Sequence, residues 1–166
     1  CDFIAIDTET TGLKPGGNDI IELAAIKFVN YRPVEILHTY LKPRKPIPED
    51  ATAVNGITDD MVLDAPTFSE IKPSLEQFIG DFPIVAHNAP FDMRFLRDRS
   101  RVRFLNNTPF DKVQVIDTMA MVGTALKKKL FETKKTPSGR FSKKQEDVAK
   151  VLNPVRKAVE EPLCKG

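Results

Sequence analysis

The 166-residue sequence has few cysteines and no long apolar segment. Its two cysteines, Cys1 and Cys164, stand at opposite ends of the chain without C-x-x-C spacing, so the sequence supports neither a structural zinc site nor a disulfide framework. No apolar run approaches the roughly 20 residues that a membrane-spanning helix needs. We therefore expect a soluble protein of a reducing, cytoplasmic compartment with no membrane partner.

The start of the chain also lacks an initiator Met and the basic and apolar regions of a signal peptide, a pattern that favours a domain excised from a longer chain. The length favours one domain that spans residues 1–166. Thirteen prolines and eight glycines are far from the composition of disordered or collagen-like chains. The sequence is therefore expected to fold around one hydrophobic core.

Charge is distributed unevenly along the chain. Residues 1–96 hold 8 Lys and Arg against 15 Asp and Glu, whereas residues 97–166 hold 17 against 8. A basic half attracts polyanions, and an acidic half in the same domain indicates carboxylates that bind a cation; two solvated faces of opposite charge are the alternative. The densest basic segment, residues 127–141, has six Lys and Arg and a Thr-Pro-Ser-Gly turn signal, which predicts a mobile loop.

Apolar periodicity predicts strands that come first in a meander and then alternate with helices. The segments expected as strands are residues 3–7, 20–29, 34–41, 83–88 and 113–117. Three prolines between residues 42 and 48 predict a loop. The segments expected as helices are residues 59–63, 67–79, 90–98, 118–126 and a further helix from 142. This order predicts an α/β fold with a mixed β-sheet and helices packed on its faces.

Two carboxylates, Asp7 and Glu9, lie two residues apart at the end of the first predicted strand. Residues at this spacing point to the same side of a sheet, where adjacent carboxylates repel each other unless they are exposed, protonated or bridged by a cation. Oxygen ligands on a strand suit Mg²⁺ or Mn²⁺. A solvated strand end is the alternative for an isolated D-x-E pattern.

A third acid, Asp92, follows the strand at 83–88 in the segment HNAPFD and is expected in the first turn of a helix. An acid in this position interacts favourably with the helix dipole, which is a structural role without chemistry. Both motifs nevertheless place acids where an apolar strand ends, and open α/β sheets bind their ligands at such ends. We therefore expect Asp92 to lie near Asp7 and Glu9.

Three ordered segments carry a family resemblance: FIAIDTETTGL at residues 3–13, AVNGITDDMV followed by APTF at 53–68, and VAHNAPFDMRFL at 85–96. Together they resemble the 3′–5′ exonucleases of the DEDD superfamily, in particular the group of proofreading epsilon subunits of bacterial DNA polymerase III. The resemblance extends to about residue 120 and implies a ribonuclease H-like fold. It also implies that Asp7, Glu9 and Asp92 bind two divalent metal ions, Mg²⁺ or Mn²⁺, which support phosphodiester hydrolysis.

The same resemblance implies a substrate and a partner. The residues expected to contact the 3′-terminal nucleotide are Thr10, Thr11, Leu13, Asn88 and Phe91, with Leu13 as an apolar wedge. Turn formation and core packing are alternative roles for these side chains. The implied substrate is a single-stranded or frayed DNA 3′ end, in proofreading or repair, with a DNA polymerase subunit as the partner. RNA is an alternative substrate, because no motif reports contacts to a 2′-hydroxyl.

Two further positions matter for the expected site. Asp117, in VIDTMAM, matches a family position where the acid positions the site and does not bind metal. The basic residues Lys127, Lys128 and Lys129 are expected to contact the backbone of a single strand, giving an affinity that depends on salt and little on sequence. Solvated lysines are the alternative for this run.

The third acidic motif departs from the family pattern, which has a His, or in a sister group a Tyr, about one helical turn before the last Asp. No His follows His87 and no Tyr follows Tyr40. Asp147 is the best-placed fourth carboxylate, with Glu146 as the alternative; Ser142 then occupies the His position and is expected to cap a helix. The sequence thus predicts an exonuclease weakened by loss of its general base, or an inactive domain that binds nucleic acid or a polymerase. A His in a segment absent from this chain is a further alternative.

Overall fold

The structure, a computed structural model, describes residues 2–100 and 109–120. Contacts divide the chain into two units, Cys1–Asp117 and Thr118–Gly166, and the fold below is that of the first unit. Within the described residues, no helix is both long and apolar enough to cross a membrane. The prediction of a single domain over residues 1–166 stays a prediction.

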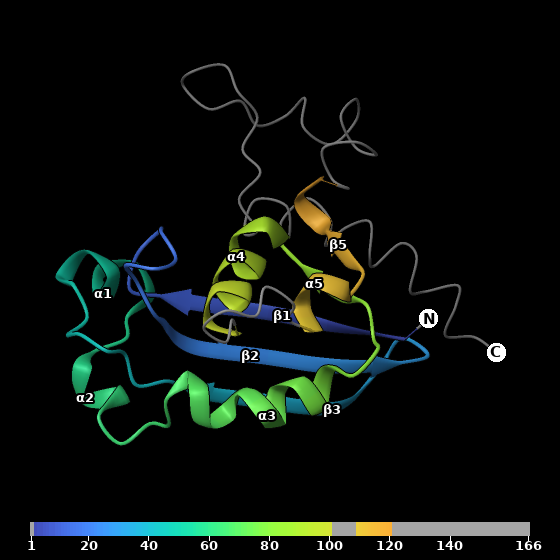
Figure 1. The fold of residues 1–166 in the computed structure, drawn as a ribbon, viewed down its shortest axis with the longest axis horizontal. Helices are drawn as coiled ribbons and strands as arrows, with labels where there is room; N and C mark the ends of the chain where they lie inside the picture. The colour runs from blue at the N-terminus through green and yellow to red at the C-terminus, as the bar shows by residue number, and fades with distance from the viewer. Residues whose placement is uncertain (1, 101–108, 121–166) are drawn as a thin grey trace, which may run out of the picture. The chain divides into compact units, whose positions relative to one another are not determined.

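A five-stranded mixed sheet with the order β3-β2-β1-β4-β5 forms the centre of this unit (Figure 1). Its antiparallel strands are β1 (Phe3–Thr10), β2 (Ile20–Val29) and β3 (Arg32–Tyr40). Two short strands continue the sheet in parallel with β1, namely β4 (Ile84–Ala86) and β5 (Val115–Asp117). Because β1, β4 and β5 are parallel, their carboxyl ends open at one edge of the sheet, which is where the acidic motifs lie.

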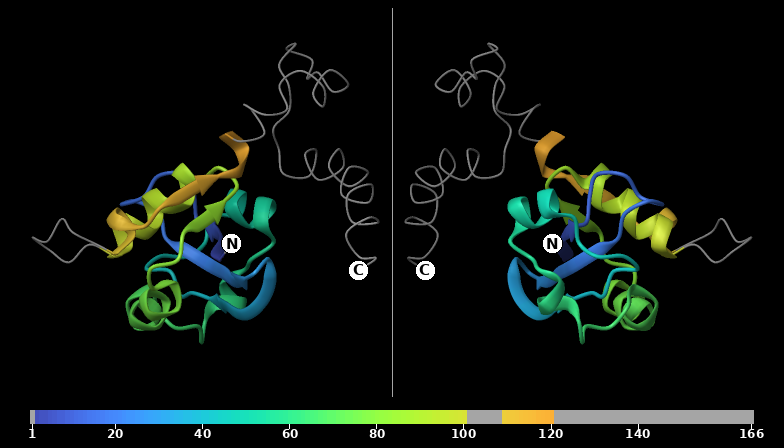
Figure 2. Two further views of the ribbon diagram at one scale, coloured as in Figure 1. Left: turned by 90° about the vertical axis from the view of Figure 1, so that its right-hand side faces the viewer. Right: turned by 90° about the vertical axis from the view of Figure 1, so that its left-hand side faces the viewer.

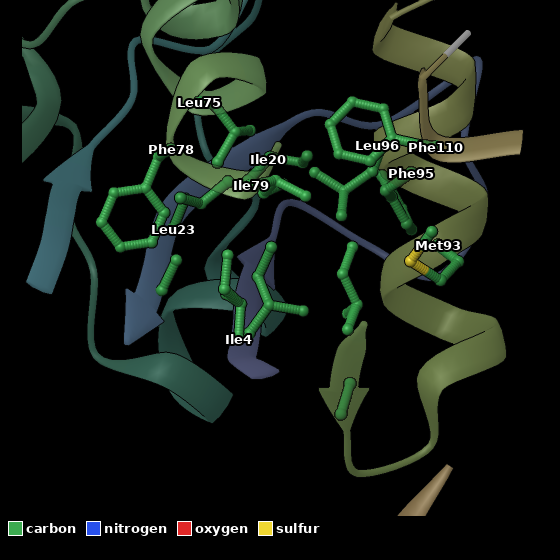
Figure 3. Packing of buried hydrophobic residues seen from close by; sticks show 14 of the residues in the cluster. Ile4, Ile20, Leu23, Leu75, Phe78, Ile79, Met93, Phe95, Leu96 and Phe110 are labelled. Carbon is green, nitrogen blue, oxygen red and sulfur yellow. The ribbon is translucent and has the colours of Figure 1, made fainter. Parts of the chain in front are cut away.

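Two long helices, α3 (Phe68–Ile79) and α4 (Ala89–Ser100), cover one face of this sheet (Figure 2). Strand alternation turns Ile4 and Ile6 of β1 toward them, and both side chains are buried. The short helix α5 (Pro109–Lys112) adds Phe110 to the same core. The side chains that converge in Figure 3 include Ile20, Leu23, Leu75, Phe78, Ile79, Met93, Phe95 and Leu96. This core fixes α4, the helix that carries Asp92, against β1.

Two further short helices, α1 (Glu49–Asn55) and α2 (Asp59–Val62), follow the proline-rich loop after β3. Val62 of α2 belongs to a second cluster of buried residues with Ile21, Ile47 and Ile57, and the partly buried Ala51 of α1 packs against it. The loop is tied to α2, because the backbone N–H of Ile47 donates to Asp59 Oδ1 at 2.9 Å. This packing brings the end of α1 to the end of β1, where Asn55 Nδ2 donates to the carbonyl of Thr10 at 3.4 Å.

The predicted mixed α/β fold is confirmed, and most predicted elements are present at slightly different bounds. The first strand continues to Thr10, beyond the predicted end at residue 7, and the loop at 42–48 is free of regular structure as expected. Sequence patterning did not predict α1, because none of its residues is buried and it therefore has no apolar stripe. Of the helix predicted at 118–126, the described residues 118–120 are helical, and the rest lies outside the described range.

Candidate functional site

Asp7 and Glu9 extend from the face of β1 that is opposite to the core. Partial burial raises the pKa of Asp7, and the nearby Glu22 raises it further, while His87 and the backbone N–H of Thr8 lower it. Partial burial also raises the pKa of Glu9, with Asp7 and Glu22 adding to the increase. The repulsion expected from the D-x-E spacing is therefore present in the folded protein.

A further carboxylate, Glu22, belongs to this acidic face, and no sequence motif marks it. The register of β1 and β2 places Glu22 directly opposite Glu9 across the sheet. His38 on β3 is hydrogen-bonded to Glu22, with its Nε2 2.6 Å from Oε1. Like charges directly opposite each other destabilise a sheet, and the register creates such a pair in Glu9 and Glu22. Only the strand register, which was not predicted, could have identified Glu22.

Asp92 lies in the first turn of α4 and is buried, with 3% of its surface exposed. Its Oδ1 accepts two hydrogen bonds from Thr8, one from the backbone N–H at 3.0 Å and one from the hydroxyl at 2.7 Å. Burial raises the pKa of Asp92 to about 6; the Thr8 hydroxyl lowers it and the negative charge of Asp7 raises it. Thr8 therefore joins the second motif to the first and favours the ionised form of Asp92 against the cost of burial.

Thr8 joins the two motifs at the end of β1, but their acids approach the strand from different sides. Asp92 is bound on the Thr8 side of the strand, whereas Asp7 and Glu9 point to the other side. This alternation accounts for a second observation: within the described residues, no three His, Cys, Asp or Glu side chains form a group that could hold a metal ion. The three acids are coupled electrostatically without forming a closed cage.

The donor set nevertheless fits a hard divalent cation. No described Lys or Arg within residues 2–100 and 109–120 forms an ion pair with Asp7, Glu9 or Asp92, and the charge interaction with His87 lowers the pKa of Asp7 less than burial and Glu22 raise it. Mg²⁺ in nucleotide-processing sites is held by one or two carboxylates together with water and substrate phosphates, and does not need a cage made only of protein. Carboxylates with raised pKa values at an open sheet edge meet this requirement.

The start of α4 is fixed by the end of β5. Asp117 Oδ1 accepts hydrogen bonds from the backbone N–H of Asn88 at 3.0 Å and of Ala89 at 3.4 Å. Asn88 has a φ of 66°, in the left-handed region that Asn tolerates better than most residues. Asp117 thus holds the turn from which Asp92 is presented, which is the positioning geometry expected for it.

The residues expected to contact a nucleotide lie near the same strand end. Thr10 and Thr11 are buried, and their hydroxyls form loop contacts: Thr10 Oγ1 donates to the carbonyl of Gly12 at 2.8 Å, and Thr11 Oγ1 accepts from the N–H of Asp19 at 2.9 Å. Leu13, in contrast, is 78% exposed. The side chains of both threonines therefore form the turn, and they present Leu13 to solvent.

Other predicted site residues lie in different surroundings. Phe91 is partly buried, packs against the core, and its ring centroid is 5.2 Å from that of Phe95. Asn88 is exposed at the turn before α4. The expected fourth carboxylate Asp147 and its alternative Glu146, together with Ser142 and the lysines at 127–129, lie outside the described residues, so their roles stay predictions.

Residues 4–152 match the sequence model of the RNase_T family, whose description is exonuclease. A DNA polymerase III subunit epsilon-like protein of Rhodobacter capsulatus is 44% identical over 122 residues, which cover 72% of this chain and 17% of that protein. The DNA polymerase III subunit epsilon of Treponema pallidum is 40% identical over 119 residues, which cover 72% of this chain and 54% of that protein. The chain thus spans about half, or less, of the length of these curated relatives.

Two solved exonucleases have a similar fold. Escherichia coli exonuclease I in complex with a dT13 oligonucleotide aligns with a TM-score of 0.73 and 17% identity, over 90% of this chain and 35% of that chain. Exonuclease X in complex with 5′ overhanging duplex DNA aligns with a TM-score of 0.58 and 26% identity, over 92% of both chains. These similarities confirm the ribonuclease H-like arrangement of a mixed sheet with helices on its faces.

Proposed function

The chain belongs to the RNase_T family of exonucleases, and on this basis we propose that it is a metal-dependent 3′–5′ exonuclease that removes nucleotides from DNA 3′ ends. The observation that carries the proposal is the junction of two acidic motifs at the end of β1. Thr8, which stands between Asp7 and Glu9 in the sequence, donates two hydrogen bonds to Asp92 of the second motif. The three carboxylates interact electrostatically and form no ion pair with a described Lys or Arg, so a divalent cation would reduce their mutual repulsion.

In the proposed reaction, a water oxygen bonds to the phosphorus of the terminal phosphodiester, and the bond to the 3′-oxygen of the preceding nucleotide breaks. Two divalent ions, Mg²⁺ or Mn²⁺, would lower the pKa of a water and stabilise the charge that develops on the phosphate. Asp7, Glu9 and Asp92 would hold these ions, with Asp147 as the expected fourth ligand. Thr8 holds the Asp92 carboxylate in place and Asp117 holds the start of its helix.

A proton acceptor for the water is the part of the machinery that the sequence does not supply in the expected place. Because no His or Tyr follows residue 87, Ser142 takes the position of the family's base. Loss of a general base costs about 10² to 10⁴ in rate, so we propose slow hydrolysis and not complete inactivity. An inactive domain that binds nucleic acid or a polymerase is the second candidate, and the same sequence observation favours it.

The relatives suggest the substrate and the partner. Two curated relatives are named as DNA polymerase III epsilon or epsilon-like subunits, and the structurally similar exonucleases were solved with DNA. We therefore propose single-stranded or frayed DNA 3′ ends as the substrate, in proofreading or repair, and a DNA polymerase subunit as a partner. The exposed Leu13 at the strand end is suited to contact an unpaired terminal base.

The proposal is tested with single-stranded DNA and RNA of identical sequence, each labelled at its 5′ end. The protein is incubated with Mn²⁺, with Mg²⁺ or with excess EDTA, and products are separated by size. A metal-dependent ladder that shortens from the 3′ end of the DNA supports the proposal. Release of the labelled 5′ nucleotide first, or activity that survives EDTA, contradicts it. Faster digestion of the RNA assigns the alternative substrate, and tight binding without hydrolysis in any metal assigns the inactive domain.

A further inference from the structure

The loop between β1 and β2, residues 11–19, is closed by a pair of reciprocal contacts. The N–H of Thr11 donates to the carbonyl of Asp19 at 2.9 Å, and the N–H of Asp19 donates to the Thr11 hydroxyl at 2.9 Å. Asp19 is itself buried, with 8% of its surface exposed. Burying an unpaired carboxylate costs folding free energy, so the groups that pair with Asp19 indicate its role in the structure.

The Asp19 carboxylate binds arginines from two distant segments. Arg44, in the loop after β3, donates its Nε to Oδ1 at 2.9 Å and its backbone N–H to Oδ2 at 3.0 Å. Arg99, near the end of α4, places Nη1 3.3 Å from Oδ1. The Arg99 side chain is largely buried, whereas that of Arg44 is 57% exposed. Asp19 is therefore the point at which the loop, the segment after β3 and α4 are joined.

The end of α4 also binds the loop directly. Arg99 Nη2 donates to the carbonyl of Asn18, and Asp98 Oδ2 accepts from the backbone N–H of Gly16 at 3.1 Å. Asp92 lies on the same helix about two turns before these residues. The contacts therefore fix the loop that bears Leu13 relative to the helix that bears the buried carboxylate of the candidate site.

The contacts among Asp19, Arg44, Asp98 and Arg99, called the Asp19 network below, border a solvent-accessible cavity. The cavity beside the Asp19 network has a volume of about 550 Å³. The lining contains the cations Lys42, Arg44 and Arg99 and the carboxylates Asp19 and Asp98, and the buried Nε of Arg99 has no hydrogen-bond partner among the described residues. Asp19 nevertheless pairs with both arginines, and these contacts join the loop to α4 and to the segment after β3.

We propose that Asp19 is a positioning residue that, together with Arg44 and Arg99, fixes loop 11–19 relative to α4. In this arrangement Leu13 contacts the 3′-terminal nucleotide, while Asp92 lies at the phosphodiester that is cleaved. The inference rests on the proposed exonuclease function. In this role Asp19 acts on substrate binding and leaves the chemical step intact. Removing one partner of a buried ion pair leaves the other charge uncompensated, so Asp19→Asn is expected to lower stability as well, and thermal unfolding must show that it is folded before its kinetics are compared.

The test uses the full chain and the variants Asp19→Asn and Arg44→Gln, the second of which changes an exposed side chain and is expected to fold normally. We expect KM for single-stranded DNA to rise about tenfold with kcat within about twofold of wild type, because misplacement of the loop weakens binding before chemistry. Asp19→Glu should recover part of the loss. The control is Glu35→Gln, which breaks the exposed Lys27–Glu35 pair on the outer strands and should leave KM unchanged.

A binding measurement separates this inference from the proposed function. In an Asp7→Ala background, the Kd is measured for linear single-stranded DNA and for circular single-stranded DNA, which has no 3′ end. We expect Asp19→Asn to weaken binding of the linear strand about tenfold and of the circle by much less. Any of three results would overturn the positioning role. The first is an unchanged Kd and KM in Asp19→Asn and Arg44→Gln; the second is equal weakening of binding to the linear strand and to the circle; the third is a fall in kcat at constant KM. Absence of hydrolysis by the wild type contradicts the proposed function alone, because the Kd ratio still reports on Asp19.

Discussion

Asp92 combines a buried position with a side chain that is ordinarily charged at neutral pH. Burial raises its pKa from 3.8 to about 6, although Thr8 donates two hydrogen bonds to one of its oxygens. A group whose pKa is raised on folding favours the folded state when it is protonated. Its contribution to stability is therefore complete below about pH 3.8 and is lost as the pH rises through about 6.

Replacement of this carboxyl by an amide should remove that pH dependence. In the absence of metal we expect Asp92→Asn to be more stable than wild type above pH 6, by about 1 to 3 kcal/mol, because the variant has no charge to bury. The difference should shrink toward zero as the pH falls to about 4. Denaturant unfolding in EDTA at several pH values measures it. The exposed Asp64→Asn serves as the control, and a variant that is less stable than wild type at high pH would contradict this assignment.

Thr8 provides a second test at the residue scale. Thr8→Val keeps the shape of the side chain and the backbone N–H but removes the hydroxyl that donates to Asp92. Because this hydrogen bond favours the ionised carboxylate, its loss should raise the pKa of Asp92 further. We expect kcat/KM to fall about three- to tenfold near pH 6 and by less at higher pH, so that the acid limb of the pH profile moves upward.

The matched control for Thr8→Val is Thr52→Val. Thr52 lies in α1, and its hydroxyl donates to the carbonyl of Ile57 at 2.8 Å. This variant should keep the wild-type pH profile, even if it loses some stability. Equal displacement of the acid limb in both variants would show that Thr8 acts only through general stability. An unchanged limb in Thr8→Val would show that its hydroxyl does not tune Asp92.

At the scale of elements, the loop after β1 has a close contact at Gly12. A Cβ at Gly12 would lie 2.6 Å from Oδ1 of Asn18, a side chain that donates to the carbonyl of Lys14 at 2.9 Å. Because this oxygen is at the end of a flexible side chain, Gly12→Ala should displace the Asn18 side chain, lower stability by about 0.5 to 1 kcal/mol and raise KM for DNA slightly. Removing the obstacle in the double variant Gly12→Ala with Asn18→Ala should recover most of both losses.

Thermal unfolding and steady-state kinetics of the two single variants and the double variant complete this cycle. Asn18→Ala alone is the control and should cost little, because its hydrogen bond is exposed. If the losses of the two single variants simply add, the clash is not the cause. Wild-type stability of Gly12→Ala would show that the loop adapts without penalty.

Apolar patterning predicted the strands and the two long helices, because these elements bury one face or stripe against a common core. The strand at 20–29 and the helix at 67–79 were predicted from spacing alone, and in the structure Thr67 and Glu70 form a capping box at the start of α3. Helix α1 was not predicted because none of its residues is buried, and α5 was not predicted because a single helical turn has no apolar periodicity, although its Phe110 is buried in the core.

The acids of the candidate site were predicted because each follows an apolar strand. The residues that support them were not, because their roles depend on contacts between segments far apart in sequence. Thr8 meets Asp92 across 84 positions, and Asp19 meets Arg99 across 80 positions of the printed sequence. Such pairings follow from strand register and helix docking, which local patterns do not encode.

At the scale of the whole molecule, the sign of the net charge differs between residues 1–96, which are acidic, and residues 97–166, which are basic. The acidic motifs and their supports lie in the first 117 residues, whereas the densest basic run, residues 127–141, lies outside the described residues. Asp147 and the predicted cytoplasmic location likewise stay predictions. The opposite signs remain consistent with a metal-binding part and a part that attracts a polyanion.

The basic run is tested by salt dependence. Replacing Lys127, Lys128 and Lys129 together by Ala should weaken binding to single-stranded DNA and reduce the slope of log Kd against log salt by about 2, because each contact to a phosphate contributes about 0.7. Fluorescence anisotropy over a salt series measures the slope. Arg32→Ala, on the edge strand β3, is the control for loss of one exposed cation. An unchanged slope in the triple variant would show that these lysines do not contact the DNA backbone and are solvated side chains.

The most direct test of the central claim is the rate at which the protein shortens a 5′-labelled single-stranded DNA from its 3′ end in Mn²⁺, compared between wild type and Asp7→Ala. Asp64→Asn is assayed in parallel as a control for loss of an exposed acid. If the acids at the end of β1 hold catalytic metal, Asp7→Ala should lower the rate about 100-fold or more, while the control keeps the wild-type rate and EDTA abolishes both. Equal rates for wild type and Asp7→Ala, in protein that is folded by thermal unfolding, would contradict the account.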